Sequence, residues 1–189
     1  MRRIVDRKLF DSALIAAQAL ELRQVTLSRI ACEMVRPYRS KPNESLSFLL
    51  KESCELMDDD ATKGHIHAVA KMTILASFER DSNSKRKTKK KSLPAFQAKV
   101  EMMLHYAITE GARPNKEALS AFAKLNGLYN AWPYLRELIS DMSTRTGYPP
   151  LLIPPLIIIP KPRKQPKSLA LAPVNAAPVI AEEQESPSR

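Results

Sequence analysis

The sequence predicts an α+β fold in which a helix leads into an antiparallel sheet and further helices follow it. Residues 46–56, 66–78 and 96–108 alternate apolar and polar side chains, as strands with one buried face do. Residues 114–127 and 130–146 instead space their apolar side chains at helical intervals. With one further strand before them, these elements predict a four-stranded antiparallel sheet with an N-terminal helix and two C-terminal helices.

The N-terminal part supplies the first helix and the first strand. Residues 9–21 are alanine-rich and amphipathic, which favours a short helix. Residues 22–35 alternate like a strand, but the apolar side chains change parity near Ser28 and Arg29. A change of parity inside a strand predicts a β-bulge.

The three later strands are expected to pair antiparallel with one another. Parallel strands are usually apolar on both faces, whereas these are apolar on one face only. The polar connectors at residues 58–64 and 81–93 contain no crossover helix, so consecutive strands form a meander. The side chains expected to face the core are the even-numbered apolar ones, among them Phe48, Cys54, Ile66, Met72, Ile74, Phe96, Val100, Met102 and Leu104.

Four residues are expected to bound the two C-terminal helices. Asn115 begins the first helix and Gly127 ends it. Asn130 caps the second, with Pro133 in its first turn, and Gly147 closes it. The inward-facing side chains are expected to be Leu119, Phe122 and Leu125 in the first helix and Trp132, Leu135, Leu138, Ile139 and Met142 in the second.

The composition changes near the C-terminal end. Ten of the 15 prolines lie from Pro149 onward. Beyond residue 160 the sequence turns to Pro, Ala, Lys and then Glu, a composition too poor in apolar residues to form a packed core. The prediction is one folded domain over residues 1–160 and a disordered tail over residues 161–189.

The formal charge of +10 points to an anionic partner. The densest cationic run lies in the second long connector, and it is either a solvated loop tip or a contact for nucleic acid or an acidic partner. No aromatic residue is interleaved with the run, which argues against base stacking. Its members are Lys85, Arg86, Lys87, Lys89, Lys90 and Lys91.

The sequence also indicates where the protein works and what it lacks. No signal peptide and no apolar run of about 20 residues is present, which favours a cytoplasmic protein without membrane insertion. Cys32 and Cys54 are expected to be two reduced, buried thiols.

No catalytic motif is present. The sequence has no phosphate-binding GxxxxGK[ST] loop, no nucleophile elbow and no HExxH pair, so we expect no enzyme and no cofactor. His65 and His67 share a strand face, and His105 is expected near them, but surface histidines without a metal are the interpretation we adopt.

One stretch of sequence resembles a known family. The order Trp132-Pro133-Tyr134-Leu135-Arg136-Glu137, followed by Tyr148-Pro149-Pro150-Leu151-Leu152, resembles the C-terminal third of the SecB family of protein-export chaperones. The first of these runs is most similar to SecB-like chaperones linked to toxin–antitoxin systems. The resemblance is specific over residues 103–156 and only topological over residues 22–100.

The resemblance implies an ATP-independent holdase that binds unfolded or nascent polypeptides and keeps them competent for export or folding. An antitoxin is one candidate client. The family also implies a homotetramer built as a dimer of dimers. The residues expected to line a client groove are Tyr129, Trp132, Tyr148, Leu151, Leu152 and Ile153.

The basic charge separates this chain from the export chaperones, whose acidic sheet face meets the translocation ATPase SecA. Docking to SecA is therefore not expected. The alternative hypothesis is a basic adaptor or nucleic-acid-binding protein on a SecB-like scaffold, with the cationic loop as its contact.

Overall fold

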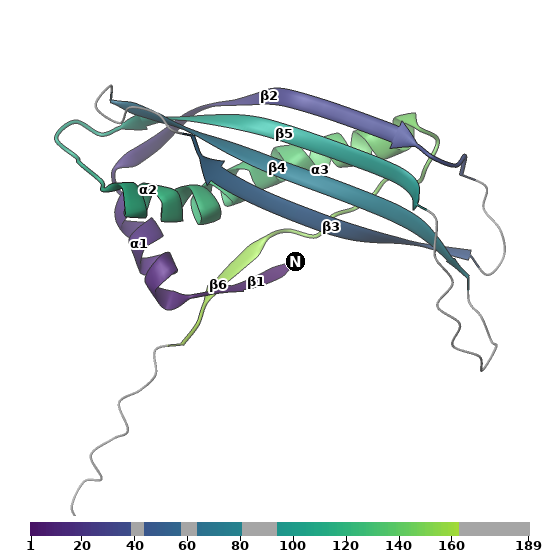
Figure 1. The fold of residues 1–189 in the computed structure, drawn as a ribbon, viewed down its shortest axis with the longest axis horizontal. Coiled ribbons are helices and arrows are strands. Elements are labelled where there is room, and N and C mark those ends of the chain that lie inside the picture. Colours follow the sequence, from purple (N-terminus) through teal and green to yellow (C-terminus); the bar gives the residue numbers. More distant parts are fainter. Residues whose placement is uncertain (39–43, 58–63, 81–93, 163–189) are drawn as a thin grey trace, which may run out of the picture.

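A computed structural model describes residues 1–38, 44–57, 64–80 and 94–162 (Figure 1). Its centre is one four-stranded antiparallel sheet, as the sequence predicted, and the order of its strands is β2-β5-β4-β3. A separate two-stranded parallel sheet joins β1 to β6. The strands are β1 (Arg2–Val5), β2 (Leu20–Met34), β3 (Glu44–Leu56), β4 (His65–Arg80), β5 (Pro94–Ile108) and β6 (Ile157–Pro160).

The predicted meander is confirmed for β3, β4 and β5. The first long strand, β2, pairs with β5 rather than with β3, so β2 and β3 form the two edges of the sheet. A register shift between Leu27 and Arg29 confirms the predicted bulge. A second shift between Leu22 and Gln24 was not predicted.

The helices are α1 (Arg7–Ala17), α2 (Lys116–Phe122) and α3 (Leu128–Arg145), with a π-helical turn, η2 (Ala123–Gly127), between the last two. The first helix begins earlier than the predicted residues 9–21, because the Asp6 side chain caps it by accepting a hydrogen bond from the Lys8 N–H, and it ends earlier, because β2 begins at Leu20. The Asn115 carboxamide caps α2 as predicted, accepting from the Ala118 N–H at 2.8 Å. Gly147 ends α3 with a φ of 80°.

The predicted break between two C-terminal helices is wrong. Gly127 has a helical φ of −58°, and α2, η2 and α3 follow one another without an interruption. Asn130 lies inside α3 and donates from its carboxamide to the Tyr106 hydroxyl at 3.0 Å instead of capping a helix. Pro133 likewise lies in the helix interior. Because proline has no N–H, it cannot donate the helical hydrogen bond to the Tyr129 carbonyl, and Tyr129 lies on the exposed side of the helix.

Gly127 is required for close approach rather than for a turn. A Cβ atom added there would lie 2.8 Å from the Cys54 sulfur, so with Cys54 in place an alanine would force the sulfur or the helical run to shift.

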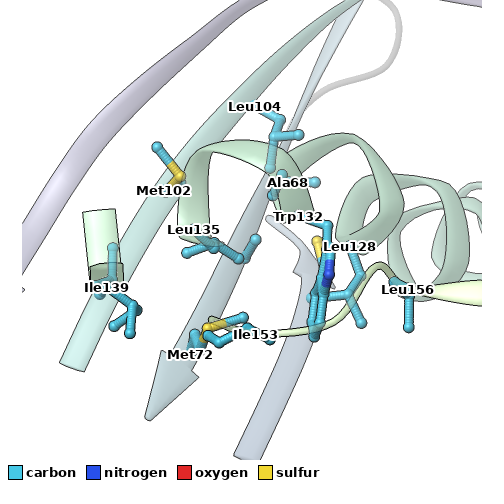
Figure 2. Close-up of a cluster of buried hydrophobic side chains, with 14 of the residues drawn as sticks. Ala68, Met72, Met102, Leu104, Leu128, Trp132, Leu135, Ile139, Ile153 and Leu156 are labelled. Atoms are coloured by element: carbon cyan, nitrogen blue, oxygen red, sulfur yellow. The ribbon is translucent and has the colours of Figure 1, made fainter. Parts of the chain in front are cut away.

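The main core lies between the sheet and the C-terminal helices (Figure 2). Strand side chains such as Met72 and Leu104 meet Leu128, Leu135 and Ile139 of α3. All the predicted inward-facing side chains of the helices are buried except Leu138, which is half-buried. A second, smaller cluster joins β1, α1, α2 and η2 through Val5, Ala13, Ala121 and Leu125.

The pairing of β1 with β6 fixes both ends of the described chain. The Met1 ammonium group donates to the Pro155 carbonyl at 2.6 Å, and the Lys161 N–H donates to the Val5 carbonyl at 2.9 Å. The sequence did not reveal this sheet, because four residues are too few to show a period.

Three predictions fall wholly or almost wholly outside the described residues: the loop at 58–64, the cationic run at 85–91 and the tail at 161–189. These, and the domain boundary at residue 160, stay predictions. Within the described part of the chain, no helix is long and apolar enough to cross a membrane.

Candidate binding surface

One face of β2 carries an apolar row that the described part of the molecule leaves uncovered. Its members pair with buried residues of β5, for example Leu27 with Met102 and Ile30 with Val100, so they point to the helix side of the sheet. Their larger apolar side chains are nonetheless exposed, from 36% for Leu22 to 48% for Met34. We call Leu22, Leu27, Ile30, Cys32 and Met34 the β2 strip.

The β2 strip is exposed because the helix layer is narrower than the sheet. The helix α3 packs on β3, β4 and β5. One flank of α3 is fastened to the segment before β6, since the Trp132 ring N–H donates to the Pro154 carbonyl at 3.0 Å and Arg136 Nε donates to the Ile153 carbonyl at 2.6 Å. This segment runs on the β3 side of the molecule (Figure 1).

The opposite flank of α3 faces the β2 side. Asn130, Tyr134 and Leu138 are spaced four residues apart and so lie on one line along the helix. Asn130 contacts Tyr106 of β5, whose neighbour in β2 is Leu22. Tyr134 is 45% exposed. The β2 strip therefore lies beside a partly apolar helix flank.

The six residues that the resemblance assigned to a client groove divide into two groups. Trp132, Leu151 and Ile153 are buried in or beside the main core, as is Tyr148. Tyr129 and Leu152 face solvent and are 54% and 76% exposed. The assignment to a client groove stays a prediction, and only these two offer large exposed apolar surface.

Tyr148 holds the start of the proline-rich segment in place. Its hydroxyl donates to the carbonyls of Ala95, at 2.8 Å, and Arg36, which lie at the start of β5 and just beyond β2. Its ring contacts Tyr38 and Phe96, with ring centroids 5.5 Å and 5.6 Å away. Desolvation by burial raises the pKa of Tyr148 and keeps the hydroxyl protonated.

Tyr106 is the corresponding buried hydroxyl under α3. Desolvation raises the pKa of Tyr106, and the hydrogen bond from Asn130 opposes that rise. Both tyrosines therefore serve as neutral hydrogen-bonding groups of the core.

The two cysteines differ, and the prediction that both are buried is wrong for Cys32. Both are free thiols. Cys54 is buried against η2, and desolvation raises its pKa to about 12. Cys32 belongs to the exposed β2 strip, because none of the described helices covers that strand. Partial desolvation raises the pKa of Cys32 as well.

The three histidines gather on the open face of the sheet, opposite the helices. The ring centroids of His65 and His67 are 5.4 Å apart, and those of His67 and His105 are 4.4 Å apart. The proximity expected from the sequence is confirmed. Within the described ranges, no group of three or more His, Cys, Asp or Glu residues is placed to hold a metal ion.

The open face is also balanced in charge. Glu101 of β5 lies between Lys71 of β4 and Arg29 of β2 in the strand register. In the described strands, the register places the cations Arg29, Lys51, Lys71 and Lys99 and the acids Glu21, Glu33, Glu55 and Glu101 on this face, and Arg23, at the first register shift, pairs with Glu21 at 2.8 Å. The described sheet therefore offers neither the basic surface that nucleic acid requires nor an acidic one.

Comparison with solved structures identifies the architecture. The Mycobacterium tuberculosis Rv1957 SecB-like chaperone, in complex with a ChAD peptide from the Rv1956 HigA1 antitoxin, aligns with a TM-score of 0.64 and 20% sequence identity. The alignment covers 78% of this chain and 97% of that chain. This chain has a SecB-like fold. At this level of identity the likeness establishes the fold alone.

The other comparisons add little. A protein of unknown function from Streptococcus agalactiae aligns at 9% identity, over 71% of this chain and 96% of that chain, but its TM-score of 0.38 carries no argument. No family model and no curated protein sequence matches this chain.

Proposed function

We propose that this protein is a cytoplasmic, ATP-independent chaperone of the holdase type, which binds unfolded or nascent polypeptides and keeps them competent for folding or export. The observation that carries the proposal is the β2 strip on a SecB-like fold. Exposed apolar surface of this extent usually marks an interaction site. The role is binding rather than catalysis.

The edge position of β2 suits an unfolded client. An edge strand presents unpaired backbone groups along one side, and the β2 strip adds apolar side chains on one face. An extended polypeptide can satisfy both features with little dependence on its sequence. Tyr129 and Leu152 extend the proposed client surface on the other flank of α3, and Trp132, Tyr148, Leu151 and Ile153 support it from the core.

An antitoxin segment is a reasonable first client to test, because the Rv1957 complex holds a peptide from an antitoxin. We further propose a homotetramer built as a dimer of dimers. Leu14 and Ile15 of α1 are 52% and 64% exposed, which supports an assembly that covers this helix. The charge-balanced open face gives no support for docking to SecA.

The proposal is tested by light scattering of an unfolded client with and without the purified protein, at low and moderate salt. Apolar binding survives added salt, so suppression of aggregation at both salt concentrations is expected. Loss of suppression at moderate salt would favour the alternative of a basic adaptor or nucleic-acid-binding protein.

A matched pair of variants locates the surface. Ile30→Asp places a charge in the β2 strip. It is expected to weaken the suppression of aggregation strongly, because a bound apolar client would remove the carboxylate from water without pairing it. Ala31→Asp places the same charge next door on the opposite face of the strand and is expected to leave suppression unchanged. Sedimentation of both variants separates a loss of client binding from a loss of assembly. Equal effects of the two variants would contradict the assignment to the β2 strip.

A further inference from the structure

A cationic cleft lies between α1 and α2, away from the β2 strip. Its volume is about 450 Å³. The polar lining comprises Lys8 and Ser12 from α1 with Lys116, Glu117, Ser120 and Lys124 from α2 and η2. Three lysines and two serines thus line the cleft together with one glutamate, so the lining carries a net positive charge that suits an anion.

The spacing of the lysines indicates the kind of anion. Lys116 and Lys124 are eight residues apart on one helical run, about 12 Å along its axis. A single phosphate or carboxylate is too small to contact both. Carboxylates distributed along a polypeptide segment can reach both ends of the cleft together with Lys8.

The chain itself carries such a segment, and the described structure ends beside the cleft. The Lys161 N–H donates to the carbonyl of Val5, which directly precedes the residue that caps α1. In residues 163–189 the acidic side chains are Glu182, Glu183 and Glu185. In extended backbone these three glutamates span about 10 Å, which matches the separation of the lysines.

The distance along the chain permits this contact. A polypeptide of 20 residues without regular structure spans about 25 Å on average, which is sufficient to return from Pro162 to a neighbouring helix pair. A tethered segment also has an effective concentration far above that of any free partner.

We propose that the segment containing Glu182, Glu183 and Glu185 binds in the α1–α2 cleft of its own chain, held by Lys8, Lys116 and Lys124. This contact does not depend on the chaperone function and uses none of the residues of the β2 strip. The proposed contact assigns a binding site on the fold to a segment of the sequence beyond residue 162.

The test is zero-length cross-linking of the full chain with a carbodiimide, which joins a carboxylate to an amine only when the two are in contact. The three glutamates are expected to couple several-fold more to Lys8, Lys116 and Lys124 than to Lys71 and Lys99, exposed lysines on the open face of the sheet. Raising the salt from about 0.1 M to about 1 M shortens the Debye length from about 10 Å to about 3 Å and is expected to reduce the preference.

A charge swap provides the matched control. Lys8→Glu with Lys124→Glu removes two of the three amines and is expected to reduce the coupling to Lys116 as well, whereas Glu182→Lys with Glu183→Lys and Glu185→Lys removes the reacting carboxylates and with them the coupling. All five substitutions together restore opposite charges and are expected to restore the coupling. Because this swapped protein still pairs carboxylates with amines, the same reagent measures it.

Mixing isotopically labelled and unlabelled protein shows which chain supplies the segment. Cross-links within one chain support the proposal. Cross-links between labelled and unlabelled chains would overturn it in favour of a contact between copies. Equal coupling to the cleft and to Lys71 and Lys99, or failure of the charge swap, would also overturn it.

Discussion

The neighbouring strands β5 and β2 carry the same kind of apolar face, but the face of β5 is buried and that of β2 is largely exposed. On β5, Phe96, Val100 and Leu104 are fully buried beneath the helix layer. Their neighbours in β2, Met34, Ile30 and Val25, point to the same side, yet Met34 and Ile30 remain exposed. The alternation of a strand therefore determines which face is apolar, whereas the width of the second layer determines whether that face is core or binding surface.

The uncovered face has an energetic consequence. Burying an aliphatic side chain stabilises a protein by about 1.5–3 kcal/mol. The β2 strip forgoes much of that stabilisation in the single chain, and a polypeptide that covers it gains the same energy on binding. The proposed binding of an unfolded client would draw on this energy rather than on a nucleotide.

The largest expected difference between the two faces is in thiol reactivity. Cys54 lies on the covered face and Cys32 on the β2 strip, so an alkylating reagent should modify Cys32 at least about a thousandfold faster in the folded protein. Desolvation also raises the pKa of Cys54 to about 12, which keeps its thiol protonated at pH 8.

Mass spectrometry of partly alkylated protein measures the two rates separately, and Cys32→Ser and Cys54→Ser variants assign them. Similar rates would show that η2 does not stay packed on β3. A bound client should slow the modification of Cys32 alone, which connects this measurement to the proposed surface.

Stability should show a smaller contrast between the same faces. Ile74 is fully buried in β4, so Ile74→Ala should lower the free energy of unfolding by about 2–5 kcal/mol through lost transfer energy and a cavity. Ile30 is 44% exposed in β2, so Ile30→Ala should cost less than about 1 kcal/mol. Urea denaturation measures both. Equal losses would mean that β2 is covered in solution, for example by a second copy.

The sequence predicted the covered region better than the uncovered one, for a physical reason. The even-numbered side chains of β4 and β5 and the bulge near Ser28 are local consequences of period, and they were predicted correctly. The exposure of Cys32 depends on how far α3 extends across the sheet, which no local pattern contains. Trp132 and Tyr148 were correctly singled out as notable, but their burial follows from contacts with residues 154 and 95, distant in sequence.

Gly127 is another residue whose role the local sequence pattern could not predict, and its substitution is expected to have a smaller effect than Ile74→Ala. The sequence suggested a helix end, because glycine commonly ends helices, but this glycine lies within a continuous helical run against Cys54. Gly127→Ala should therefore destabilise the protein by about 1–3 kcal/mol, since the new methyl group would lie 2.8 Å from the Cys54 sulfur.

A second substitution, Cys54→Ala, should reverse the sign of the effect that Gly127→Ala has on stability. Cys54→Ala removes the sulfur, and the remaining neighbours of the new methyl group, the Cβ atoms of Ala68 and residue 54, lie at ordinary contact distances of 3.7 Å and 3.9 Å. In that background Gly127→Ala should be neutral or stabilising by up to about 1 kcal/mol, because alanine favours a helix more than glycine does. Urea denaturation of the four proteins measures the coupling between the two sites. An equal cost of Gly127→Ala in both backgrounds would show that the glycine serves the π-helical turn itself rather than its contact with β3.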